Sequence, residues 1–244
     1  MRHMLQHNIG LIFVRQISHS TQNVSVYALV TTNVIDNRSF LSSKGIAYVA
    51  PLRLTGNDHT TENLSTDFRD FLGSRYEHHY TPEEILGYIY AVMHAPTYRA
   101  RYAEFLRIDF PRVPFPESSD DFETLSGLGW ALVQAHLLRE LPRRGLAFYH
   151  GRGDERVEAV RYAPAEEAIA INKTQSFRSV PRDVWEFRIG GYQVLDKYLK
   201  SRKGRTLSLD EIDHVGAVAD SLAFTIDQMA RIDAAYRAAF PEQA

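Results

Sequence analysis

The chain has 244 residues, of which 44% are hydrophobic and 24% are charged, and its formal net charge is -2. It contains no cysteine, which excludes disulfides, thiol nucleophiles and cysteine-ligated zinc. A chain of this length can bury a core as one large domain or two small ones, and no apolar run approaches the roughly 20 residues that span a bilayer. We therefore expect a soluble, cytoplasmic protein with no membrane partner. The nearly balanced charge neither implies nor excludes a nucleic-acid partner.

The N-terminal part contains three short apolar, β-rich runs, at positions 9–14, 24–30 and 46–50. Runs of this length between polar loops are typical of strands. Pro51 cannot donate a ladder hydrogen bond, so it ends the third run or marks an edge strand. The sequence therefore predicts a β-rich segment over residues 8–55.

A helical segment is expected next, over residues 62–142. Thr81-Pro82-Glu83-Glu84 combines a capping-box pair with proline at the first helical position, which predicts a helix start. Pro96 ends this helix, and Tyr98, Tyr102 and Phe105 line a second short one.

The rest of the helical segment contains a proline-rich stretch and a longer helix. Residues 110–116 include three prolines and are predicted to be extended. Asp120 to Glu123 then repeat the capping pattern and open a helix to about Leu141. Gly129 is a possible point of close approach on that helix.

A second β-rich segment is predicted over residues 155–190. Residues 157–162 alternate apolar and charged side chains, 168–171 form an apolar run, and 185–189 form a short aromatic run. Gly190 and Gly191 follow, and apolar residues recur at helical spacing from about Tyr192. Glycines before a helix allow an anion to approach its free N–H groups. The same pattern fits an ordinary turn into an amphipathic helix, and the spacing leaves both interpretations open.

The C-terminal part predicts one long helix. Ser208 and Glu211 form a third capping box, and apolar residues then recur three and four positions apart up to Phe240. At 1.5 Å per residue this helix would be about 45 Å long. Asp233 interrupts the apolar seam and suggests fraying near its end. The predicted fold class is α+β, with a mixed β-sheet core, a helical insertion and C-terminal helices over residues 191–240, in a single domain of residues 1–244.

Known motifs for chemistry are missing from the sequence. It has no phosphate-binding loop, G-x-G-x-x-G, G-x-S-x-G or H-E-x-x-H motif. Glu77-His78-His79 lacks a second ligand group at a useful spacing, and Arg188 near Glu186 stands where a nuclease would carry a lysine. Arg152-Gly153-Asp154 is best interpreted as a turn. We expect no catalytic residue, no metal site and no cofactor in this chain.

Three polar, mostly basic segments remain as candidates for binding DNA. Arginine and lysine suit guanine edges and phosphates, and glutamine suits adenine edges. The same segments could equally be solvated loops. The candidate residues are Arg15, Gln16, Ser18, Lys173, Thr174, Gln175, Arg178, Lys197, Lys200, Arg202, Lys203 and Arg205.

The sequence also resembles a known family along nearly its whole length. The matching stretches include residues 8–16, 81–91, 98–102, 110–114, 171–173, 184–187, 189–192 and 202–208. They resemble the C-terminal specificity domain, or target-recognition domain, of type ISP restriction–modification enzymes.

The resemblance implies that this chain is one part of a longer polypeptide. Such polypeptides join a nuclease, a helicase-like ATPase, an adenine methyltransferase and the target-recognition domain. ATP, Mg and S-adenosylmethionine would serve the other parts, and an upstream methyltransferase domain would end near residues 1–4. The implied partners of this chain are double-stranded DNA and that methyltransferase domain.

We therefore expect a non-enzymatic module that recognises a particular double-stranded DNA sequence. Residues 197–205 would hold phosphates, and side chains around Arg15 and between residues 172 and 178 would contact bases. One alternative is a helical docking domain that binds a protein partner and makes no DNA contact. A third interpretation is a hydrolase with an unrecognised carboxylate site.

Overall fold

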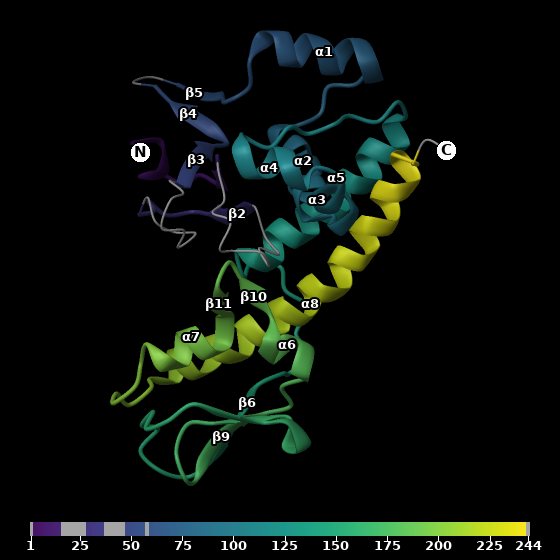
Figure 1. Cartoon of the computed structure of the whole chain (residues 1–244). Coiled ribbons are helices and arrows are strands. Elements are labelled where there is room, and N and C mark those ends of the chain that lie inside the picture. The colour runs from purple at the N-terminus through teal and green to yellow at the C-terminus, as the bar shows by residue number, and fades with distance from the viewer. Residues whose placement is uncertain (1, 16–27, 37–46, 57–58, 243–244) are drawn as a thin grey trace. The chain divides into compact units, whose positions relative to one another are not determined.

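The computed structural model describes residues 2–15, 28–36, 47–56 and 59–242 (Figure 1). The described residues form an α+β fold with helices, several small antiparallel sheets and a long C-terminal helix, which confirms the predicted fold class. Contacts divide the chain into two compact units. Unit 1 comprises Met1–Gln22, Val26–Leu137 and Gln228–Ala244, and unit 2 comprises Asn23–Ser25 and Leu138–Asp227. None of the described helices is both long and apolar enough to cross a membrane.

Unit 1 begins with a short 3-10 helix η1 (Arg2–Met4) and a three-stranded antiparallel sheet. Its strands β2 (Ala28–Thr31), β1 (Gly10–Val14) and β3 (Ala47–Pro51) lie in that order. Buried and half-buried side chains alternate along β1, as expected for a strand with one face on the core. The predicted strands are confirmed for the described residues, and positions 24–27 and 46 lie outside them. A hairpin of β4 (Arg53–Thr55) and β5 (Thr60–Glu62) follows.

Five helices complete the first part of unit 1: α1 (Thr66–Tyr76), α2 (Pro82–His94), α3 (Pro96–Arg101), α4 (Ala103–Ile108) and α5 (Ser119–His136). The predicted capping box at the start of α2 is confirmed. The Glu84 backbone N–H donates to Thr81 Oγ1 at 3.2 Å, and the Thr81 N–H donates to Glu84 Oε2 at 2.6 Å. The predicted short helix around Tyr98 is two helices, which meet at Tyr102.

Helices α2 and α5 cross at two glycines. A Cβ on Gly129 would lie 1.9 Å from the Gly87 carbonyl oxygen, and a Cβ on Gly87 would lie 2.4 Å from the Ser126 oxygen. The backbones approach so closely that neither position has room for a side chain, which confirms the predicted role of Gly129. The predicted end of α5 near Leu141 is wrong. The helix ends at His136, and the backbone at Leu138 is left-handed with a φ of 54°.

The proline-rich stretch of residues 110–116 is extended, as predicted, and tyrosines satisfy its carbonyl groups. Tyr76 donates its hydroxyl to the Pro116 oxygen and Tyr98 to the Arg112 oxygen, each at 2.8 Å, and Tyr88 donates to the Pro114 oxygen. The stretch has few N–H groups and belongs to no strand, so it cannot form a regular ladder of backbone hydrogen bonds. The tyrosine hydroxyls supply the donors that these carbonyl groups need.

Unit 2 contains a four-stranded antiparallel sheet. Its strands are β6 (Phe148–Gly151), β9 (Gln175–Arg178), β8 (Ala168–Ala170) and β7 (Arg161–Ala163), in that order, with a 3-10 turn η2 (Pro164–Glu166) between β7 and β8. Phe177 and Ile169 face each other across β9 and β8 and are fully buried. They belong to a core that includes Leu195 and Leu199 of the helix α7 (Val194–Lys200).

The segment after the sheet differs from the prediction. Residues around Trp185 form a short helix α6 (Arg182–Glu186) instead of a strand, and the Trp185 ring stacks on Tyr162 with centroids 5.1 Å apart. Gly190 and Gly191 form the turn of a hairpin between β10 (Arg188–Ile189) and β11 (Tyr192–Gln193). Gly190 has a φ of 59°, which glycine adopts without strain. Helix α7 therefore starts two residues later than expected, and the glycines do not lead directly into it.

The long C-terminal helix α8 (Leu209–Ala239) is confirmed, and its residues belong to both units. The predicted capping box at its start is present, since Glu211 N–H donates to Ser208 Oγ at 3.2 Å and Ser208 N–H donates to Glu211 Oε2 at 3.1 Å. The expected fraying at Asp233 is wrong. Asp233 caps α3 within unit 1 by accepting hydrogen bonds from the Thr97 backbone N–H and hydroxyl.

Candidate nucleic-acid interface

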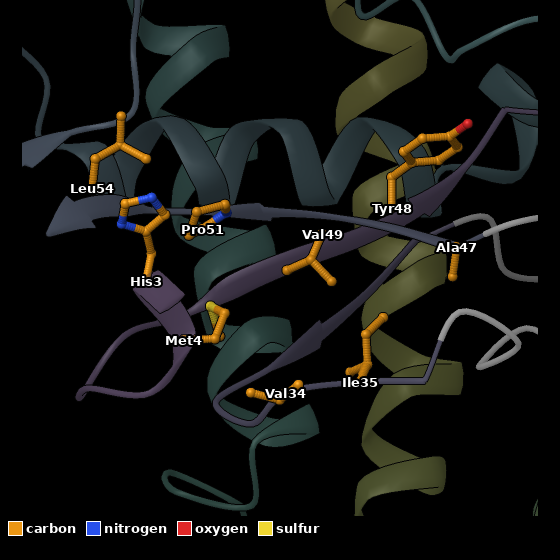
Figure 2. A pocket seen from close by; sticks show the side chains of 9 residues that line it. All are labelled: His3, Met4, Val34, Ile35, Ala47, Tyr48, Val49, Pro51 and Leu54. Carbon is orange, nitrogen blue, oxygen red and sulfur yellow. The ribbon is translucent and has the colours of Figure 1, made fainter. Parts of the chain in front are cut away.

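Unit 1 contains an apolar pocket of about 370 Å³ (Figure 2). The imidazole of His3 lines this pocket, and its Nδ1 accepts a hydrogen bond from the Thr55 N–H at 2.9 Å. The described lining contains no lysine, arginine or carboxylate, so it offers no cation to a phosphate backbone. The lining residues are His3, Met4, Val34, Ile35, Ala47, Tyr48, Val49, Pro51 and Leu54.

The first predicted basic segment lies in unit 1. Arg15 follows β1 directly, and its side chain is 57% exposed. Its Nε lies 3.6 Å from Asp109 Oδ1, and its guanidinium carbon lies 5.7 Å from the centroid of the Phe110 ring. Gln16 and Ser18 lie outside the described residues. The other predicted contact residues all belong to unit 2.

The second predicted segment is the loop between β8 and β9, and Asn172 organises it. Asn172 Oδ1 accepts hydrogen bonds from the Thr174 N–H at 3.0 Å and the Gln175 N–H at 2.8 Å. Its Nδ2 donates to Gln175 Oε1 at 2.6 Å and to the Arg156 carbonyl at 3.0 Å. These bonds fix the loop backbone and leave Lys173 and Thr174 exposed at its tip.

Gln175 is too deeply buried to contact a base. Its side chain is 2% exposed. Its Oε1 accepts a hydrogen bond from the Glu155 backbone N–H at 3.2 Å, in addition to the bond from Asn172. These partners enclose the side-chain amide. Gln175 therefore joins the two loops and does not present its amide to a ligand.

A second loop, residues 151–156, interlocks with the first. A Cβ on Gly151 would lie 2.1 Å from the Thr174 carbonyl oxygen, and one on Gly153 would lie 2.6 Å from Gln175 Oε1. The Thr174 hydroxyl donates to the Arg152 carbonyl at 3.1 Å. We call residues 151–156 and 171–175 together the loop pair. Its contacts leave no room for a side chain at Gly151, place Gly153 against the Gln175 amide and place Arg152 beside the Lys173 loop.

The loop pair is joined directly to the segment after α7, since the Leu207 N–H donates to the Glu155 carbonyl at 3.0 Å, and the neighbouring Val157 continues this pairing. The Val157 N–H donates to the Arg205 carbonyl at 2.9 Å, and the Gly204 N–H donates to the Val157 carbonyl at 2.7 Å. On its other side the same stretch is bonded to the residue that follows β8, since the Glu158 N–H donates to the Ile171 carbonyl at 2.8 Å. This pairing draws residues 157–160 away from the sheet, so the predicted strand over 157–162 is wrong except at its last two residues.

Most cations of the third segment have partners within the fold. Lys200 Nζ lies 2.8 Å from Asp196 Oδ2, Arg202 Nε lies 2.8 Å from Glu211 Oε1, and Arg205 lies 3.1 Å from the same Glu211 oxygen. The hydrogen bond from the Ser208 N–H and the bond from Arg202 lower the pKa of the Glu211 carboxyl. Glu211 is therefore a fixed negative charge that ties the turn to α8.

Two aromatic rings contact further cations, Lys197 of α7 and Arg202 in the turn after it. The Arg202 guanidinium lies 3.5 Å from the centroid of the Tyr198 ring, and Lys197 Nζ lies 4.7 Å from the centroid of the Tyr192 ring. The Arg202 side chain is 20% exposed, so it stabilises the turn more than it faces solvent. Lys203 is exposed and makes no ion pair with any residue that the structure describes.

The solvent-facing side of the sheet carries further groups, at the end of the β6–β9 ladder away from the loop pair. Arg178 is exposed and lies directly opposite Phe148, whose side chain is 47% exposed. The sequence predicted Arg178 but missed Phe148, Arg152 and Arg156. The alternation of β6 and β9 could have placed Phe148, but nothing local in the sequence indicates that residues 152–156 lie beside residue 174.

The described residues offer no cluster of three histidine, aspartate or glutamate side chains that could bind a metal. What the surface of unit 2 presents is a set of exposed cations without carboxylate partners in the described part of the chain, on a backbone fixed by hydrogen bonds. These cations are Arg152, Arg156, Lys173, Arg178 and Lys203.

Three solved structures share this fold. A nuclease-deletion mutant of the Type ISP restriction-modification enzyme LlaGI, in complex with a DNA substrate mimic, is 17% identical with a TM-score of 0.64 over 94% of this chain. The DrdV–DNA complex is 19% identical with a TM-score of 0.68 over 97% of this chain. The ATP-dependent Type ISP enzyme LlaBIII bound to DNA is 14% identical with a TM-score of 0.70 over 98% of this chain.

This chain corresponds to 21%, 25% and 16% of the lengths of those three chains, respectively. No curated protein matches the sequence. The family model of the Type ISP C-terminal specificity domain matches residues 1–229, which is nearly the whole chain. The chain therefore belongs to the family of Type ISP C-terminal specificity domains.

Proposed function

We propose that this chain is the module that recognises the target sequence in double-stranded DNA for a Type ISP restriction–modification polypeptide. Its family supports this role, and the three similar structures are all described as DNA complexes. The lack of nucleotide-binding and hydrolase motifs in the sequence agrees with a role in recognition.

The observation that carries the proposal is the direct backbone pairing of Val157 with residues 204 and 205. Through this pairing the loop pair and the turn after α7 form one surface of unit 2. Two of the three basic segments are thus adjacent, although about 30 residues separate Lys173 from Lys203 in the chain. Exposed cations on a fixed backbone, such as Lys203 in the turn after α7, suit the regularly spaced phosphates of a duplex.

The candidate residues divide by their environment into two groups. Lys197, Lys200, Lys203 and Arg205 are exposed and would contact phosphates, with Lys203 contributing most because Asp196 and Glu211 already neutralise Lys200 and Arg205. Arg202 would mainly hold the turn.

Side chains on the loop pair and on β9 would contact base edges. Lys173 and Thr174 are exposed on the loop pair, Arg178 is exposed at the far end of β9, and all three carry groups that suit bases. Gln175 would position the two loops. Arg15, Gln16 and Ser18 would supply a further contact from the segment after β1.

The chemistry of the complete polypeptide would take place on other domains. A nuclease, a helicase-like ATPase and an adenine methyltransferase would use ATP, Mg and S-adenosylmethionine, and the methyltransferase domain would be the second partner of this chain. In this role the protein would work in the cytoplasm, where its DNA substrate is available.

A binding titration with labelled duplex DNA at two salt concentrations tests the proposal. We expect affinity to fall steeply as salt rises, and Lys203→Ala to weaken binding to every sequence and to lower the salt slope by about 1. Arg182→Ala is the matched control, because Arg182 is an exposed cation of unit 2 that pairs with Glu186 on α6. A wild-type chain that binds no duplex at either salt concentration would contradict the proposal and favour a protein-docking role.

A further inference from the structure

The loop pair differs from the turn after α7 in the chemistry that it exposes. Arg152, Asp154, Lys173 and Thr174 are all exposed, so the loop pair presents an anionic acceptor and a hydroxyl among its cations. Asp154 lies between Arg152 and Arg156 in sequence, and no ion pair joins it to either of them among the described residues. A carboxylate placed against phosphates would repel them, so this mixed surface is poorly suited to the DNA backbone alone.

Base edges in the major groove require such a mixture of donors and acceptors. Arginine donates two hydrogen bonds to O6 and N7 of guanine, and aspartate accepts a hydrogen bond from the N4 amino group of cytosine. A guanine–cytosine pair displays both kinds of edge side by side. Arg152 and Asp154, two residues apart on one turn and both exposed, carry the donor and the acceptor that these two edges require.

The turn that carries the two side chains is fixed from behind. Gly151 has a φ of 114° and Gly153 lies against the Gln175 amide, so the backbone approaches β9 without a Cβ at either position. The Gln175 Oε1 bond to the Glu155 N–H holds one end of the turn. The Thr174 hydroxyl bond to the Arg152 carbonyl holds the other end.

Neither side chain is used to stabilise this turn through an ion pair. Asp154 Oδ1 accepts a hydrogen bond from the Arg156 N–H at 3.3 Å, and its Oδ2 has no hydrogen-bond partner among the described residues. Arg152 likewise bonds to the described part of the chain through its backbone carbonyl and not through its guanidinium. The turn therefore presents one donor group and one acceptor oxygen to a ligand on a preorganised backbone.

We propose that the turn Arg152-Gly153-Asp154 determines sequence specificity by contacting one guanine–cytosine pair, with Arg152 on guanine and Asp154 on cytosine. This inference rests on the proposed DNA-recognition function. It assigns base contact to two residues that the sequence patterns had indicated only as a turn.

Selection from a pool of random duplexes tests the inference. The wild-type chain, Arg152→Gln and Asp154→Asn are each used to capture DNA, and the captured duplexes are sequenced. We expect the wild type to select a site with a guanine–cytosine pair at one position. Arg152→Gln should shift that position towards adenine, and Asp154→Asn should reduce the preference for the pair by roughly 10-fold.

Two controls keep the result interpretable. Asp154→Asn retains the Oδ1 acceptor for the Arg156 N–H, so the turn is expected to keep its structure, and thermal unfolding checks this. Lys203→Ala should lower affinity without changing the selected sequence.

The possible failures separate this inference from the proposed function. If the wild type selects a sequence and both turn variants select the same one, the inference is overturned and the proposed function stands. A uniform loss of affinity in Arg152→Gln would make Arg152 a phosphate contact and would also overturn it. A wild-type chain that captures no duplex would overturn both.

Discussion

Gln175 Oε1 and the backbone nitrogen of Glu155 are joined by a hydrogen bond of 3.2 Å that spans 20 residues of sequence. This bond links the two loops that expose Arg152, Asp154, Lys173 and Thr174. The same oxygen accepts a bond of 2.6 Å from Asn172, so one buried amide holds both loops in place.

We expect Gln175→Ala to destabilise unit 2 by about 1–3 kcal/mol, because the half-buried Glu155 N–H and one N–H of the Asn172 amide lose their acceptor. Chemical unfolding measures this loss, and hydrogen exchange should show faster exchange of the Glu155 amide. Lys173→Ala is the matched control, since Lys173 is exposed in the same loop and its loss should leave stability nearly unchanged. Equal stability of Gln175→Ala and the control would show that the amide does not hold the loops together.

Gly129→Ala should destabilise unit 1 by about 1–3 kcal/mol, because its Cβ would overlap the Gly87 carbonyl oxygen 1.9 Å away and force α2 and α5 apart. Gly127→Ala on the same helix has nothing within 4 Å of the new Cβ. It should stabilise the helix by about 0.5–1 kcal/mol through the backbone entropy of the unfolded chain. Urea unfolding of both variants provides the measurement, and shifts of the same sign would argue against a tight crossing.

Asp233→Ala removes the cap that α8 provides for α3. The carboxylate accepts bonds from the Thr97 N–H at 2.6 Å and its hydroxyl at 3.0 Å, and the Asp233 side chain is 14% exposed. Loss of such a cap should cost about 0.5–2 kcal/mol in the free energy of unfolding. Asp233→Asn keeps an acceptor for the N–H and should lose less. If the two variants unfold at the same urea concentration as the wild type, the cap contributes nothing to stability.

A buried histidine, His94, and a half-buried one, His136, make the stability of unit 1 depend on pH. Burial, reinforced by His136 nearby, holds the pKa of His94 well below its usual value, and burial lowers the pKa of His136 to about 4. His94 Nδ1 is bonded to the Tyr90 carbonyl at 2.8 Å, and its Nε2 is buried without a described partner. The folded state therefore favours two neutral imidazoles.

Because the unfolded chain binds protons at these histidines more readily, unit 1 should lose stability as the pH falls below about 6.5. For His136 the loss should continue down to about pH 4. Each histidine contributes a slope of about 1.4 kcal/mol per pH unit within its range. Urea unfolding at pH 7 and pH 5 measures the difference, and His94→Leu should reduce it. A free energy of unfolding that does not change between these pH values would contradict the argument.

Local signals predicted much of the fold. The capping boxes at Thr81 and Ser208 marked two helix starts, because a capping box depends on residues three positions apart. Gly129 was predicted to mark a close approach of another backbone to its helix, because glycine has no side chain to prevent it. By contrast, the aromatic run around Trp185 resembled a strand, and its helix depends on a start after Pro181 and on stacking with Tyr162.

The candidate interface could be predicted only in part, because its arrangement depends on contacts between distant residues. The basic residues were visible in the sequence, but their partners were not. Glu211 neutralises Arg202 and Arg205 from the next helix, and the Gln175 amide is buried and accepts a hydrogen bond from the Glu155 backbone N–H. Composition alone does not distinguish a polar side chain that faces a ligand from one that holds two loops together.

Exchange of this segment between enzymes tests most directly whether it specifies the DNA target. Residues 1–229 would replace the corresponding specificity domain of another Type ISP enzyme, and the adenines methylated by the hybrid would be mapped. The account predicts methylation at a new sequence, the same one that this chain selects from random duplexes. Methylation that remains at the original sequence of the recipient enzyme would contradict it.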